Sequence, residues 1–117
     1  MRSSLGKALY PSGFFKGPID YTSNELKLSE KKVEKKSCDI ARANGWFTRK
    51  YKSPARKGVQ DRIFIKEGRV IFIEYKRAGN CPTDLQCDEA QQMKEHGAEV
   101  WWTNTVRGTK KILGILT

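Results

Sequence analysis

Two carboxylates and a lysine are spaced so that a β-hairpin would bring them together. Glu67-Gly68 separates two strand-like runs and has the composition of a two-residue hairpin turn. Pairing outward from this turn places Asp61 directly opposite Glu74, with their Cβ atoms roughly 5 Å apart on one face. Because side chains alternate along a strand, Lys76 returns to the same face two residues later. The open end of the hairpin is therefore predicted to present two acids and one amine together.

The surroundings of these acids limit what they can do. Large apolar side chains occupy both faces of the hairpin, with Ile63 and Phe72 on one face and Phe64 and Ile71 on the other. Two facing carboxylates beside such a core repel each other and lose hydration, so they need a cation or a proton. Hard oxygen ligands favour Mg²⁺ or Mn²⁺. The alternative is a structural cluster in which Lys76 balances both acids.

Most of the positive charge of the chain lies beside the same residues. The 117-residue chain has 23 Lys and Arg against 13 Asp and Glu, a net charge of +10. Positions 42–77 hold eleven Lys or Arg and three acids, so they carry +8 of that total. Such a concentration favours a polyanion such as nucleic acid, with a highly solvated surface as the alternative. The side chains expected to contact backbone phosphates are Arg49, Lys50, Lys52, Ser53, Arg56, Lys57 and Arg62.

Hydrophobic periodicity and capping signals predict the elements that would position these residues. Capping boxes, in which Thr is followed three residues later by Glu or Gln, begin two helices, at Thr22 and Thr83. The predicted elements are helices over 22–44, 83–97 and 106–116 and strands over 46–51, 59–65, 70–75 and 98–103. This α-β-β-β-α-β-α order predicts an α/β domain with a central sheet flanked by helices.

Composition indicates one globular domain. Residues 1–22, rich in Gly, Pro and aromatic residues, are expected to form an irregular arm, and residues 23–117 the single domain. No apolar run approaches the roughly 18 residues of a membrane span, and a secretory signal is lacking, so we expect a cytoplasmic protein without a membrane partner. Three cysteines without Cys-x-x-Cys spacing are expected to be reduced thiols.

The motifs in this order resemble a nuclease superfamily. Gln60-Asp61, twelve further residues and then Glu74-Tyr75-Lys76, between two helices, resemble the PD-(D/E)xK nucleases. The resemblance is closer to their VRR-NUC branch, because a stretch like residues 53–62 precedes the Asp and a Pro-Thr-x-x-Gln segment, here residues 82–86, follows. The match covers roughly residues 29–105. One departure is Gln60, which replaces a family Pro that shapes the backbone and ligates nothing.

The resemblance implies a restriction-endonuclease-like fold with a mixed sheet, and it implies roles for individual residues. Asp61, Glu74 and the backbone carbonyl of Tyr75 would ligate Mg²⁺ or Mn²⁺. Lys76 would orient or deprotonate the attacking water and counter the charge that develops on the phosphate. Gln86 would position water or phosphate, although its capping role alone could explain it.

The family also places a Glu of the first helix near the metal. Glu34 lies beside the apolar stripe through Val33 and Ser37, eleven residues before Gly45, a spacing like that of related junction resolvases. We therefore expect Glu34 to be a catalytic metal ligand. Glu30, one turn earlier on the same side of the helix, is the alternative.

These features predict a metal-dependent, structure-selective DNA endonuclease that hydrolyses phosphodiester bonds. The resemblance implies a homodimer that acts on branched or flapped DNA, such as Holliday junctions, in phage replication and repair, within a bacterial or phage-infected cell. Two alternatives remain open at this point: a non-catalytic DNA-binding module with a nuclease fold, and a nuclease that cleaves RNA.

Overall fold

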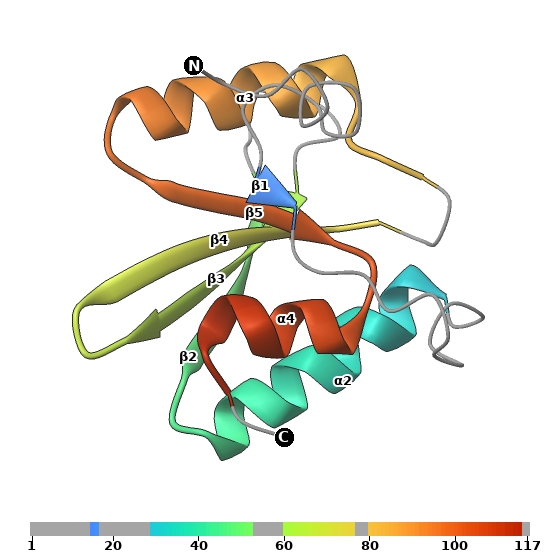
Figure 1. The fold of residues 1–117 in the computed structure, drawn as a ribbon, viewed down its shortest axis with the longest axis vertical. Helices are drawn as coiled ribbons and strands as arrows, with labels where there is room; N and C mark the ends of the chain where they lie inside the picture. The colour runs from blue at the N-terminus through green and yellow to red at the C-terminus, as the bar shows by residue number, and fades with distance from the viewer. Residues whose placement is uncertain (1–14, 17–28, 53–59, 77–79, 116–117) are drawn as a thin grey trace.

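A central sheet flanked by helices forms the described part of the chain. The computed structural model describes residues 15–16, 29–52, 60–76 and 80–115, and the side chains of residues 15, 16, 52, 60 and 61 fall outside this description. The elements are β1 (Phe15–Lys16), α2 (Glu30–Ala43), β2 (Phe47–Lys52), β3 (Gln60–Lys66), β4 (Arg69–Tyr75), α3 (Asp84–Glu95), β5 (Glu99–Thr103) and α4 (Val106–Leu113). Figure 1 shows α3 on one face of the sheet and α2 and α4 on the other. None of the described helices is long and apolar enough to cross a membrane.

The strands form one mixed sheet in the order β1-β5-β4-β3-β2. Strands β2, β3 and β4 are antiparallel neighbours, whereas β5 runs parallel to β4 and β1 runs parallel to β5. A parallel pair needs a crossover, and α3 supplies it between β4 and β5. The predicted α/β architecture and the order of its elements are confirmed.

The hairpin of β3 and β4 has the predicted register. Lys66 pairs with Arg69 across the turn, and the described pairing continues to Arg62 opposite Ile73. Both turn residues have positive φ, 49° at Glu67 and 83° at Gly68, as a two-residue turn that matches the strand twist requires. The predicted register is therefore confirmed from the turn as far as Arg62 and Ile73.

Two hydrophobic clusters cover the two faces of the sheet. On the α2 and α4 side, Val33 and Ile112 belong to the cluster that includes Phe64, Ile71 and Ile73 of the sheet. On the α3 side, the cluster contains Ala90, Val100 and Trp102, with Phe72 packed against it. Since neighbouring residues of β4 enter different clusters, Glu74 shares the face of Phe72. Glu74 therefore belongs to the α3 side of the sheet.

The N-terminal predictions need correction. The helix predicted over 22–44 has its observed N-cap at Ser29, whose hydroxyl accepts a hydrogen bond from the Lys32 backbone N–H, while Thr22 and Glu25 lie outside the described residues. Two residues of the expected irregular arm form β1, because the edge of β5 offers unpaired backbone groups.

The last helix also needs correction. It was predicted to end at Leu116 but ends at Leu113, since Gly114 adopts a left-handed conformation with φ of 74°.

Candidate active site

The end of β4 and the first turn of α3 meet at the candidate site. Glu74 and Lys76 lie at the end of β4, and Gln86 lies three residues after the N-cap of α3. The predicted capping box is confirmed: Thr83 Oγ1 accepts from the Gln86 backbone N–H at 3.2 Å, and the Thr83 backbone N–H donates to Gln86 Oε1 at 2.9 Å. Capping therefore fixes the Gln86 side chain against the helix start.

Gln86 connects the carboxylate to the ammonium group. Its Nε2 donates to Glu74 Oε2 at 2.8 Å, and its Oε1 accepts from Lys76 Nζ at 3.2 Å. Glu74 and Gln86 are only 4% and 5% exposed. The structure thus brings together three of the predicted site residues, Glu74, Lys76 and Gln86, in one hydrogen-bonded group.

The chemistry of this group suits a divalent cation. A buried carboxylate loses hydration and requires compensating partners, of which the Gln86 amide is one. Carboxylate oxygens are the donors that Mg²⁺ and Mn²⁺ prefer, and Asp61 lies on the neighbouring strand, opposite Tyr51 of β2. The side chain of Asp61 lies outside the described residues. Among the described residues no three His, Cys, Asp or Glu side chains form a metal cluster. Of the two carboxylates predicted to bind metal in the hairpin, Glu74 is the one whose side chain the structure describes.

The side chain of Tyr75 belongs to the hydrophobic core and not to the candidate site. Its side chain is buried on the α2 and α4 face, where its hydroxyl lies 2.8 Å from Thr109 Oγ1. Burial raises the pKa of Tyr75 well above its ordinary value, and the hydrogen bond to Thr109 only partly offsets this. The side chain is therefore part of the core, and only the backbone carbonyl is available to the predicted metal site.

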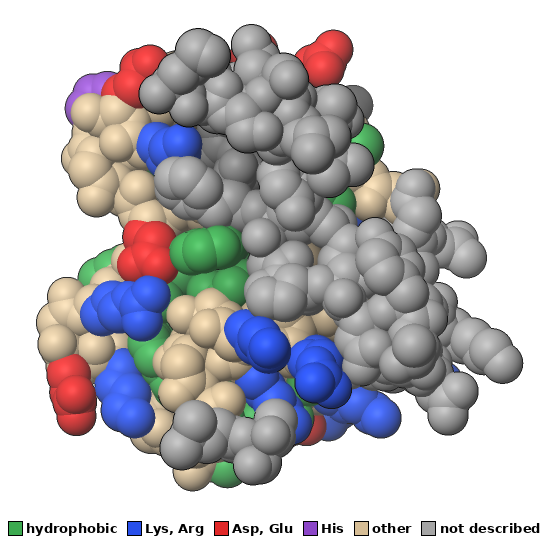
Figure 2. All heavy atoms as spheres, in the orientation of Figure 1, with side chains coloured by type: hydrophobic (Ala, Val, Ile, Leu, Met, Phe, Trp, Pro, Cys, Tyr) green, Lys and Arg blue, Asp and Glu red, His purple; other side chains and the backbone are tan. Residues whose placement is uncertain are grey.

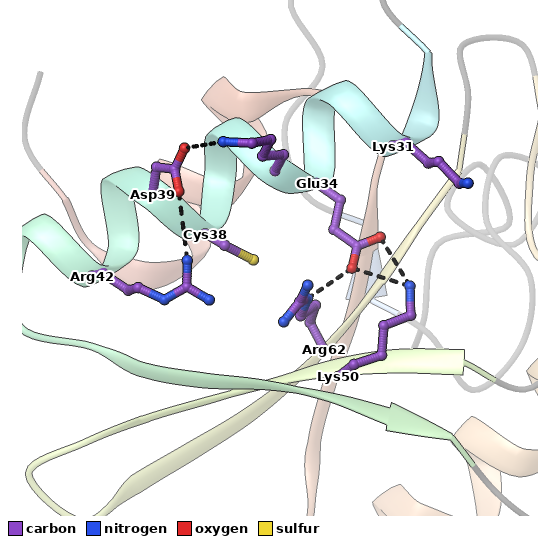
Figure 3. Close-up of a pocket in the computed structure, with 8 residues that line it drawn as sticks. Lys31, Glu34, Cys38, Asp39, Arg42, Lys50 and Arg62 are labelled. Carbon is purple, nitrogen blue, oxygen red and sulfur yellow. Dashed lines mark hydrogen bonds and ion pairs between the residues drawn. The ribbon is translucent and has the colours of Figure 1, made fainter.

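Glu34 has its described contacts with other residues. It projects from α2, and its Oε2 accepts hydrogen bonds from Arg62 Nε at 2.7 Å and Lys50 Nζ at 3.3 Å (Figure 3). Arg62 pairs with Ile73, whose side chain belongs to the cluster on the α2 and α4 side, so Arg62 and Glu74 lie on opposite faces of the sheet. The described contacts therefore do not join Glu34 to Glu74. The alternative acid, Glu30, is exposed in the first turn of α2.

The structure describes the side chains of three of the seven predicted phosphate-binding residues. Of those described, Arg49 lies 4.3 Å from the ring centre of Phe47, whereas Lys50 and Arg62 contact Glu34. The backbone of Lys52 is described as the end of β2, but its side chain is not. Ser53, Arg56 and Lys57 lie outside the described residues.

One polar residue near the site was not predicted. The backbone N–H of Lys76 donates to Thr103 O at 3.1 Å, which places the following residue, Asn104, beside the end of β4. Asn104 is 5% exposed, and its Oδ1 has no hydrogen-bond partner in the described part of the chain. Because β4 and β5 are parallel, their carboxyl ends lie at the same end of the sheet. A polar Asn directly after an apolar strand was the available sequence signal.

Comparisons with known proteins bear on the family and the fold of the chain. No family model matches the chain. A protein of Acyrthosiphon pisum secondary endosymbiont phage 1, named "Putative nuclease p44", is 34% identical over 74 residues, which cover 62% of this chain and 80% of that protein. A solved structure described as a VRR_NUC domain shares the fold with a TM-score of 0.63 at 23% identity, over 75% of this chain and 97% of that chain. The chain belongs to the VRR-NUC family of nucleases.

Proposed function

We propose that this nuclease is a divalent-metal-dependent endonuclease that hydrolyses phosphodiester bonds of branched DNA. The observation that carries the proposal is the hydrogen-bonded group of Glu74, Gln86 and Lys76 at one end of the sheet, in which Glu74 and Gln86 are buried. A carboxylate, an amide and an ammonium held together can bind a cation, fix a donor and stabilise an anion. These are the tasks that phosphodiester hydrolysis requires.

The metal ligands in this proposal are oxygen atoms of two adjacent strands. Glu74 and Asp61 would supply carboxylates, and Tyr75 would supply its backbone carbonyl. When bound, Mg²⁺ or Mn²⁺ would supply positive charge at the phosphate oxygens. We leave Glu34 out of this set, because Arg62 and Lys50 already hold its carboxylate in the described structure.

In this scheme Lys76 acts on the reacting groups, and Gln86 positions Lys76. Gln86 holds the Lys76 ammonium at 3.2 Å through Oε1 and the Glu74 carboxylate at 2.8 Å through Nε2, so the two cannot move independently. Lys76 then orients the attacking water and stabilises the negative charge that develops on the phosphate. Preorganised donors of this kind are effective because they need no rearrangement during the reaction.

The positive charge of the protein and its similarity to nucleases both favour a nucleic-acid substrate. Figure 2 shows Lys and Arg side chains gathered over the half of the molecule where Figure 1 places α2 and α4. With a net charge of +10, the chain suits a polyanion bound through its backbone phosphates. Preference for branched or flapped DNA, a homodimer with one site per strand, and action in the cytoplasm of a bacterial or phage-infected cell complete the proposal.

Cleavage of a labelled panel tests the proposal. The panel contains a four-way junction, a flap, a nicked duplex, single-stranded DNA and RNA, each incubated with Mg²⁺, Mn²⁺ or EDTA. We expect metal-dependent cutting of the branched DNA, lost in Lys76→Ala and retained in Lys36→Ala, which removes an exposed lysine of α2. Binding without cutting under every metal would identify a DNA-binding module, and preferential cutting of RNA would identify a ribonuclease.

A further inference from the structure

A pocket of about 330 Å³ lies between α2 and strands β2 and β3, on the sheet face opposite α3 (Figure 3). Three elements contribute positively charged side chains to its lining, which are Lys31, Lys35, Arg42, Lys50 and Arg62. Three of these, Lys31, Lys35 and Arg42, lie outside the set that the sequence predicted to contact phosphates. None of the lining residues belongs to the group of Glu74, Lys76 and Gln86, so the pocket is a second site.

The acids of the pocket do not balance its cations. Glu34 accepts hydrogen bonds from Lys50 and Arg62, and Asp39 lies 3.1 Å from Lys35 and 3.5 Å from Arg42. Two carboxylates thus face five cations, which leaves an excess of three positive charges in a concave site. Lys31 forms no ion pair within residues 29–52, 60–76 and 80–115. The site therefore attracts a further anion.

The geometry of the cations suits a phosphate group. Arg62 donates to Glu34 through Nε, and its terminal amino groups form no hydrogen bond within the described part of the chain. Those planar donors match phosphate oxygens, while the lysines act as point charges around them. The pocket volume of about 330 Å³ gives enough space for a hydrated phosphodiester.

Given the endonuclease function proposed above, we propose that this pocket binds a backbone phosphate of the nucleic acid at a distance from the bond that is cut. Arg62 lines this pocket on the α2 side of the sheet, whereas the Glu74 carboxylate contacts Gln86 on the α3 side. Strand β2 is the edge of the sheet at this point. A nucleic acid that fills both sites therefore passes around this edge, and the pocket holds an arm of the substrate beyond the scissile phosphate.

Two matched double variants test this proposal. Lys31→Gln with Lys35→Gln removes two charges from the pocket, whereas Lys32→Gln with Lys36→Gln removes two charges from exposed positions of the same helix that do not line it. Affinity for a labelled four-way junction is measured in EDTA over a range of salt concentrations, so that binding is read without cleavage. Circular dichroism and thermal melting verify that both variants fold.

We expect the pocket variant to bind about tenfold more weakly, with a slope of log affinity against log salt that is smaller by roughly one to two. The control variant should change affinity less than the pocket variant at every salt concentration. Equal affinities of the two variants would overturn the pocket contact, while cleavage by both would leave the proposed function intact. Wild-type protein that binds no nucleic acid would overturn both proposals.

A free anion is the other source of the same chemistry. Calorimetric titration with inorganic phosphate separates the two sources, using the same two double variants. Phosphate binding that is lost only in Lys31→Gln with Lys35→Gln, together with unchanged affinity for the junction, would assign the pocket to a free anion and overturn the nucleic-acid contact.

Discussion

The side-chain amide of Gln86 donates to Glu74 Oε2 at 2.8 Å from a position in which the amide cannot be reversed. The Thr83 backbone N–H and the Lys76 ammonium both donate to the other end of the amide, so that end must be the carbonyl oxygen. Glu74 therefore always faces a donor. The start of α3 thus determines how the carboxylate at the end of β4 is held.

Substituting this amide tests the relationship. Gln86→Glu replaces the donor with a carboxylate oxygen that faces Glu74, and like charges at this distance repel. We expect the free energy of unfolding at pH 7 to fall by about 1–3 kcal/mol and cleavage to be lost. The repulsion raises the folded-state pKa of the pair above the unfolded value of about 4.3, so the deficit should be absent below that pH and grow as the pH rises.

Gln92→Glu is the matched control, since Gln92 is exposed on the same helix. Urea denaturation at several pH values reads both variants. We expect this control to stay within about 0.5 kcal/mol of the wild type. A deficit in Gln86→Glu that does not change with pH would contradict the electrostatic explanation.

Glu34 is expected to stabilise the junction of α2 with the sheet rather than to bind metal. Glu34→Gln weakens charge-assisted hydrogen bonds from Arg62 and Lys50, so we predict a loss of about 1–2 kcal/mol in the free energy of unfolding. The Mg²⁺ concentration for half-maximal cleavage should not change. Asp39→Asn, which alters only exposed ion pairs, should cost about 0.5 kcal/mol or less. A large rise in the Mg²⁺ requirement with unchanged stability would instead identify Glu34 as a ligand.

Tyr75 gives a prediction about alkaline pH. Its hydroxyl lies 2.8 Å from Thr109 Oγ1 in the core, so Tyr75→Phe should lower the free energy of unfolding at pH 7 by about 1 kcal/mol. Burial raises the pKa of Tyr75 in the folded state above the unfolded value of about 10. The stabilisation is therefore complete below pH 10 and is lost as the pH rises further, while the Phe variant lacks this loss.

The measurement is urea denaturation at neutral pH and above pH 10. The difference between wild type and Tyr75→Phe should narrow as the pH rises. Tyr51→Phe, at a half-buried position whose hydroxyl makes no hydrogen bond with the described residues, is the control and should lie within about 0.5 kcal/mol of the wild type at pH 7. If the difference in the free energy of unfolding stayed constant across the pH range, ionisation of the Tyr75 hydroxyl would not be coupled to unfolding.

Local signals predicted the parts of the site that depend on short stretches of chain. The Glu67-Gly68 turn fixed the hairpin register, and the capping box at Thr83 placed Gln86 at the start of α3. The first helix was less well defined, because Thr22 and Ser29 are both acceptable N-caps and local chemistry does not rank them.

Contacts between distant elements were beyond the sequence. Spacing along a helix shows which residues share its inner face, but it does not show which cations of the sheet meet them. Glu34 was placed beside the apolar stripe of its helix, but its partners Lys50 and Arg62 come from two strands of the sheet. The lysines that join this pocket from α2 belong to an ordinary charged face in sequence. Their meaning depends on the packing of α2 against β2 and β3.

Asn104 should separate stability from activity. Its buried Oδ1 lacks a hydrogen-bond partner in the described part of the chain, and such a group destabilises a fold by roughly 1–3 kcal/mol. Asn104→Leu removes that group and keeps the branching of the side chain, although Leu is larger, so the gain from removing the unpaired oxygen offsets the tighter packing and we expect stability close to that of the wild type. Since Asn104 lies beside the end of β4 that carries Lys76, we expect cleavage to fall at least about tenfold, the effect of losing one positioned polar group.

Asn44→Leu is the control and should show the opposite pattern. Asn44 is an exposed C-cap of α2 whose amide donates to Ile40 O at 2.9 Å, so its loss should lower stability by about 1 kcal/mol and leave cleavage unchanged. Melting temperature and single-turnover cleavage of the preferred branched substrate read both variants. Full cleavage by Asn104→Leu would show that the buried amide does not serve the reaction. The loss of stability in Asn44→Leu measures the effect of removing a structural amide. An equally large loss of stability in Asn104→Leu would show that the Asn104 amide also has a structural role.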